Sequence, residues 1–132
     1  MSWSPRGRRR GGHGATRATL PLVPAVADAV APTPVLAAGG IADGRGLAAA
    51  LALGAQGALI GTRFYAAEES LAHPRLKERL VRARAEETQR TRVFDVVRGY
   101  RWPTPYTGRA VRNRFVERWE GREGELAAAQ GE

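Results

Sequence analysis

The chain of 132 residues contains no cysteine and no apolar run that approaches the length of a membrane span. Without thiols, neither a disulfide nor a thiolate-bound metal ion can form. A membrane-spanning helix needs about 20 consecutive apolar residues, so we expect no membrane partner. The N-terminal segment also lacks the apolar core of a secretory signal. Together these absences are typical of a cytoplasmic protein.

Acidic residues are missing from the first twenty positions, although the chain as a whole carries a net charge of +8. This segment holds five arginines, which leaves a charge of only +3 for the remaining residues. We expect residues 1–18 to form a disordered basic arm. Such an arm could attract nucleic acid, but elsewhere Glu and Arg alternate along helices, and this pattern argues against a nucleic-acid-binding domain.

Two short apolar segments predict buried strands at Val35–Ala38 and Ala58–Ile60. Between them, Asp43 is a favourable N-cap for a helix whose small and apolar residues recur at helical spacing. Gly54 would end that helix. Two parallel strands joined by one helix end at the same edge of a sheet.

Small residues follow each expected strand, and these are the main candidate site residues. Glycine lets backbone amides approach a ligand closely, and converging amides bind phosphate groups. The four residues therefore predict a phosphate site, with ordinary tight turns as the alternative. The candidates are Gly39, Gly40, Gly61 and Thr62.

Three charged residues near these turns have simpler interpretations. Arg63 could contribute charge to an anion site, but a structural ion pair is favoured. His13, between glycines, could act as a general base near neutral pH. Its local sequence alone favours a residue of the basic arm. His73 precedes Pro74 at a helix start and is expected to be a capping or surface residue.

The rest of the chain predicts further helices but few strands. Thr19 would cap a helix over residues 20–30, and a last helix would run from Arg109 to Trp119. Residues 88–107 are expected to form an extended, aromatic-rich segment. Two strands alone do not make a stable sheet, and a complete eight-fold barrel needs about 250 residues. The pattern is therefore typical of part of a larger α/β architecture.

Several of these segments, in the same order, resemble the FMN-dependent nitronate monooxygenases, also called 2-nitropropane dioxygenases. The resemblance covers about residues 11–126. Its motifs are Gly11-Gly12-His13, Leu22–Val30, Pro34–Gly46, Gly57–Phe64, Glu68–Ser70, Ala72–Lys77, Thr91–Asp95, Trp102-Pro103, Gly108–Asn113 and Trp119–Glu123.

The resemblance implies an α/β fold, namely a partial TIM (β/α)8 barrel: the C-terminal strands and helices of an FMN-binding barrel, with a C-terminal helical extension. Residues 19–126 would form this part and residues 127–132 a tail. The resemblance also implies FMN-phosphate contacts at the four candidate residues and a catalytic role for His13. The implied activity is oxidation of alkyl nitronates with molecular oxygen.

Departures from the family pattern limit what this chain is expected to do alone. Family members have Glu-Ala before Gly-Gly-His, whereas this chain has Arg9-Arg10. A shifted reading frame or a misplaced start would explain that junction. We expect little activity from the chain by itself and self-association through exposed barrel edges. The alternatives are an FMN-dependent enoyl-acyl-carrier-protein reductase and a non-catalytic remnant.

Overall fold

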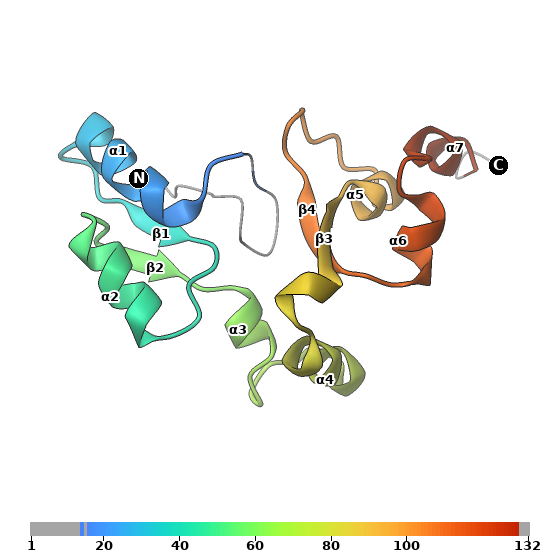
Figure 1. The fold of residues 1–132 in the computed structure, drawn as a ribbon, viewed down its shortest axis with the longest axis horizontal. Coiled ribbons are helices and arrows are strands. Elements are labelled where there is room, and N and C mark those ends of the chain that lie inside the picture. The colour runs from blue at the N-terminus through green and yellow to red at the C-terminus, as the bar shows by residue number, and fades with distance from the viewer. Residues whose placement is uncertain (1–13, 15, 130–132) are drawn as a thin grey trace.

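The computed structural model describes Gly14 and residues 16–129, and its elements fall into two groups (Figure 1). One group contains β1, β2, α1 and α2, and the other contains β3, β4, α5, α6 and α7; α3 and α4 lie along the connection. The helices are α1 (Thr19–Val30), α2 (Gly44–Ala52), α3 (Thr62–Tyr65), α4 (Pro74–Arg82), α5 (Val93–Val97), α6 (Arg114–Trp119) and α7 (Glu123–Ala128), and the strands are β1 (Leu36–Ala38), β2 (Gly57–Leu59), β3 (Thr88–Thr91) and β4 (Gly108–Val111).

The first group contains the predicted strand–helix–strand unit. Strands β1 and β2 pair in parallel, with Leu36 opposite Gly57 and Ala38 opposite Leu59. Each strand lies within one residue of its predicted bounds. Helix α2 joins them and begins after Asp43, whose carboxylate accepts the Gly46 N–H at 2.9 Å. The predicted helix cap is therefore confirmed.

A small apolar core holds this unit together. It consists of five buried residues from α1, β1, α2 and the turns beside the strands: Val23, Ala37, Ile41, Ala50 and Ala55. Three of the five are alanines, so the elements approach one another closely. Burying apolar surface contributes about 25 cal/mol per Å², and these short side chains offer little of it.

Thr19 differs from its predicted role. The N-cap of α1 is Ala18, and Thr19 is the first helical residue. Its buried hydroxyl donates instead to the carbonyl oxygen of Ala38 at 3.3 Å. The prediction of a Thr19 cap was wrong because a tertiary acceptor at the end of β1 competes with the local backbone amides.

Gly54 confirms the predicted end of α2 and provides a stability test. Its φ is +95°, and an added Cβ would lie 3.3 Å from the Cβ of Ala27. We expect Gly54→Ala to lower the free energy of unfolding by about 1–2 kcal/mol, because L residues disfavour this backbone conformation. Gly44→Ala is the matched control, since a Cβ there meets nothing within 4 Å. Equal urea midpoints for the two variants would contradict this expectation.

The second group is an antiparallel pair covered by short helices, and here two predictions were wrong. Residues 88–107 are not a single extended segment, because β3 and α5 occupy their first half. The helix expected from Arg109 to Trp119 is two elements: β4, which pairs with β3, and α6. Phe115, which the helical spacing predicted to be buried together with Val111 and Trp119, is 38% exposed, whereas its neighbour Val116 is fully buried.

Side-chain caps explain where these elements begin. The Asn113 side-chain oxygen accepts the Val116 N–H at 2.9 Å and so starts α6. The Thr91 hydroxyl accepts the Val93 N–H at 3.0 Å where β3 gives way to α5. Asn and Thr favour such positions because they satisfy otherwise unpaired amides. The pairing of β3 with β4 overrides the helical pattern of residues 109–111.

Apolar surface remains uncovered on the described part of the chain. The predicted apolar face of α2 buries only Ala50, while Leu47 and Leu51 are 37% and 46% exposed. Helix α4 has no buried residue. The two sheets have two strands each, so residues 14 and 16–129 contain no closed barrel. Within the same residues, no helix has the length and apolar character needed to cross a membrane.

One backbone contact connects the N-terminal end of the described chain to the second group. Gly14 is buried and forms an isolated antiparallel bridge with Thr107. The Gly14 N–H donates to the Thr107 carbonyl at 3.0 Å, and the return bond measures 3.4 Å. Most of the arm predicted at residues 1–18 lies outside the described residues.

Candidate functional site

The two glycine turns lie at one edge of the parallel pair. Because Ala38 is opposite Leu59, the chain leaves both strands at neighbouring positions and on the same side. Neighbouring strands are separated by about 4.8 Å. Gly39 and Gly40 therefore lie beside the turn that contains Gly61, as the strand–helix–strand pattern predicts. We call these two turns the glycine corners.

The first glycine corner has a backbone that only glycine adopts readily. Gly39 and Gly40 have φ values of +112° and +74°. Consecutive residues of this kind turn the chain sharply without side chains above the turn. The second corner differs, because Gly61 has a φ of −105° and is the N-cap of α3. An added Cβ at Gly61 would meet nothing within 4 Å.

The backbone amides of the corners follow the last paired residues of the two strands. The β1–β2 ladder ends at Ala38 and Leu59. In the described part of the chain, the turn and loop hydrogen bonds include none donated by the amides of Gly39, Gly40 or Gly61. Backbone amides of small residues that no turn or loop bond occupies fit the oxygen atoms of a phosphate group. Thr62 begins α3, is exposed, and adds a hydroxyl.

Charged residues around the corners have mixed roles. Asp43 brings a carboxylate to the N-terminus of α2, so this helix end is already occupied by an internal acceptor. Arg63 is exposed and makes no ion pair with any described residue, which differs from the structural pair we expected. Arg45 is exposed as well. His13 lies outside the described residues.

His73 has the predicted capping role. Its side-chain Nδ1 accepts the Arg75 N–H at 3.2 Å at the start of α4. In the part of the chain that the structure describes, no three His, Cys, Asp or Glu residues gather closely enough to hold a metal ion.

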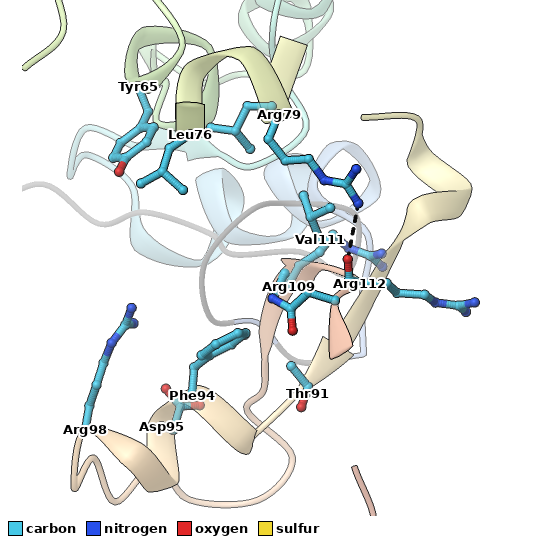
Figure 2. A pocket seen from close by; sticks show the side chains of 14 residues that line it. Tyr65, Leu76, Arg79, Thr91, Phe94, Asp95, Arg98, Arg109, Val111 and Arg112 are labelled. Atoms are coloured by element: carbon cyan, nitrogen blue, oxygen red, sulfur yellow. Dashed lines mark hydrogen bonds between the residues drawn. The ribbon is translucent and has the colours of Figure 1, made fainter. Parts of the chain in front are cut away.

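A cavity that the sequence did not predict lies between α4 and the second group (Figure 2). It is open on one side, has a volume of about 570 Å³ and is lined by residues of α3, α4, β3, α5 and β4. Leu76 and Tyr65 lie on one wall, and Phe94 and Arg98 lie across from them. The amphipathic pattern of α4 was visible in the sequence. Its facing wall comes from α5, in a segment that was expected to be extended, and from β4, whose residues 109–111 were expected to be helical, so the cavity could not be anticipated.

Two arginines stabilise the β3–β4 pair beside this cavity. Arg90 and Arg109 are directly opposite each other, an arrangement that like charges disfavour. Each is anchored by a threonine: Arg109 donates to the Thr88 hydroxyl at 2.8 Å and Arg90 to the Thr107 hydroxyl at 3.1 Å. The threonine oxygens compensate for the repulsion.

A pair of charged residues with shifted pKa values lies in α7, outside both the glycine corners and the cavity. In α7 the Arg122 guanidinium donates to the Glu125 carboxylate at 3.0 Å. This hydrogen bond lowers the pKa of Glu125 below its usual value and raises the pKa of Arg122. Both groups are exposed, so the pair contributes little to stability.

Similar proteins identify the family of this chain. The family model for nitronate monooxygenase matches residues 5–130. A nitronate monooxygenase, npaC, of Metarhizium robertsii is 44% identical over 117 residues, which cover 83% of this chain and 33% of that protein. A probable nitronate monooxygenase of Staphylococcus aureus is 35% identical over 108 residues, which cover 82% of this chain and 28% of that protein.

Solved structures of similar fold include two enzymes. FabK from Thermotoga maritima superimposes with a TM-score of 0.81 at 37% identity, covering 98% of this chain and 39% of FabK. A nitroalkane oxidase from Streptomyces ansochromogenes gives a TM-score of 0.74 at 33% identity, covering 91% of this chain and 35% of the oxidase. The chain thus spans about a third of the length of these relatives. The family match over nearly all of its length means that the chain belongs to the nitronate monooxygenase family.

Proposed function

We propose that this chain supplies the phosphate-binding corner of an FMN-dependent enzyme that oxidises alkyl nitronates with molecular oxygen. The observation that carries the proposal is the pair of glycine corners at one edge of β1 and β2. FMN ends in a dianionic phosphate, which needs several converging donors and no bulky side chains.

Four residues would bind that phosphate. Gly39 and Gly40 would donate their amides from a turn of positive φ. Gly61 and Thr62 would donate from the neighbouring turn, with the Thr62 hydroxyl as a further donor. The exposed guanidinium of Arg63 lies next in the chain and would add positive charge. Because Asp43 occupies the start of α2, we assign the binding to the corner amides rather than to that helix dipole.

Family resemblance extends the proposal to the substrate. Bound FMN would supply the redox chemistry that nitronate oxidation requires. His13, which matches the family's active-site histidine, would act on the substrate carbon or nitro group. An imidazole is an effective general acid or base near neutral pH, so His13 would hold or release a proton there.

The same family match supports a barrel as the complete fold. Strands β1 and β2 would be neighbouring strands of a (β/α)8 barrel, whose phosphate sites lie at the carboxyl ends of its strands. The corners occupy that end of β1 and β2. The remaining strands would come from the family fold that this chain does not span.

Flavin binding tests the proposal directly. Purified chain mixed with FMN is expected to co-elute with flavin absorbance on a sizing column, and riboflavin, which lacks the phosphate, is expected to bind at least about tenfold more weakly. Equal binding of FMN and riboflavin, or a colourless folded protein, would contradict a phosphate site. A colourless protein would favour a non-catalytic remnant instead.

A second candidate function is FMN-dependent enoyl-thioester reduction, favoured by the structural similarity to FabK. The two activities are separated by their co-substrates. The flavin-loaded protein is expected to consume oxygen with a nitroalkane. NAD(P)H oxidation with an enoyl thioester, without nitroalkane-dependent oxygen consumption, would favour the reductase.

A further inference from the structure

We infer that the cavity between α4 and the second group is the docking groove for an acidic amphipathic helix. This helix would belong to the part of the family fold that the chain does not span. The inference rests on family membership and on the groove itself, and it does not depend on flavin chemistry.

Helix α4 needs a covering partner. It has nine residues and buries none of them among the described elements. Isolated helices shorter than about 12–15 residues are marginal in water, and most helical stability comes from packing an apolar face. The side of α4 that lines the groove carries Leu76 and Leu80, and Leu76 is 51% exposed.

The groove offers an open apolar surface rather than an enclosed chamber. Phe94 and Val111 face α4 from the second group (Figure 2). Tyr65, which also lines the groove, is 46% exposed. Pockets for small ligands bury about 70–90% of the ligand surface, whereas an amphipathic helix lays a stripe of apolar side chains into an open groove. The exposed mouth therefore fits a helix better than a small molecule.

Positive charge at the rim defines the partner's chemistry. Three exposed arginines line the groove, and Arg79 donates a hydrogen bond to the carbonyl of Arg112 at 3.4 Å (Figure 2). The buried Asp95 is the one carboxylate in the lining. A helix that presents Asp or Glu beside its apolar stripe would complement this rim. The three arginines are Arg79, Arg98 and Arg112.

The chain length of the relatives supports an amphipathic helix of the same fold as the occupant of the groove. This chain corresponds to about a third of the Metarhizium robertsii protein. The other two-thirds of such a fold must pack against surfaces that the described residues leave uncovered. The groove is one of these surfaces, and it is separate from the glycine corners.

Co-expression tests the docking. The full chain would be produced with the tagged Metarhizium robertsii protein from which the matched third has been deleted. We expect a one-to-one complex by multi-angle light scattering. Leu76→Glu is expected to raise the dissociation constant of this complex at least about 30-fold. Val81→Glu is the matched control, because Val81 lies on the same helix, is 72% exposed and does not line the groove.

The salt dependence of binding tests whether the partner helix is acidic. Arg98→Glu is expected to weaken the complex about five- to tenfold at 0.05 M salt and by a smaller factor at 0.5 M salt, because salt screens exposed charges. Failure to form a complex, or equal losses for Leu76→Glu and Val81→Glu, would overturn the inference. The inference would also be overturned if octanoate, an anionic amphiphile, stabilised the chain and no complex formed. A complex that binds no flavin would leave docking intact and contradict only the proposed function.

Discussion

Replacing Gly61 with aspartate is expected to abolish most FMN binding without unfolding the protein. The new carboxylate would stand at the phosphate corner, where an exposed pair of like charges costs about 2 kcal/mol, or roughly 30-fold in the dissociation constant. The backbone tolerates the change, because φ at Gly61 is −105° and a Cβ there meets nothing within 4 Å. Aspartate is also favoured at an N-cap, which is the position Gly61 occupies before α3.

Gly124→Asp provides a matched control for this experiment. Gly124 also has open space around its added Cβ, and it lies in α7, far along the chain from both corners. The two variants have the same net charge. Fluorescence titration with FMN would measure both dissociation constants, and thermal unfolding would verify their stability. Equal FMN affinities would contradict phosphate binding at the Gly61 corner.

Val23→Asp is expected to unfold the strand–helix–strand unit. Val23 is fully buried in the core formed with Ala37, Ile41, Ala50 and Ala55. An unpaired carboxylate there would cost at least about 3 kcal/mol. The other four core residues are apolar, so none of them offers a polar side chain that could pair with the charge. Circular dichroism during urea unfolding would measure the loss.

Leu71→Asp is the control for the core substitution. Leu71 is fully exposed, so the same charge there is expected to change the free energy of unfolding by no more than about 0.5 kcal/mol. A Val23→Asp protein with a wild-type urea midpoint would mean that the core of the first group does not hold the unit together.

The strand–helix–strand unit could be predicted because its signals are local. Asp43 marks the start of α2 and Gly54 its end, and both act through hydrogen bonds or backbone angles within a few residues. Parallel pairing of β1 with β2 then follows from the length of the connection. The candidate residues at the corners came from this same local pattern, and their role as phosphate ligands is still a prediction.

The second group could not be predicted in the same way. Residues 108–111 have apolar positions that fit a helix, yet they pair with β3, whose own sequence is polar. That pairing joins segments about twenty residues apart and depends on contacts such as the Arg109–Thr88 hydrogen bond. Local propensity is a weak guide to strands because cross-strand packing decides them.

The sequence by itself determined the family and the order of elements from Thr19 to Thr62, because short-range caps, glycine turns and apolar spacing act within a few residues. Only the tertiary structure decided which surfaces meet: that Thr19 bonds to the end of β1, that β4 is a strand, and that α4 faces an arginine-rimmed groove. Such contacts join distant segments, and their energies depend on the partner each side chain finds after folding.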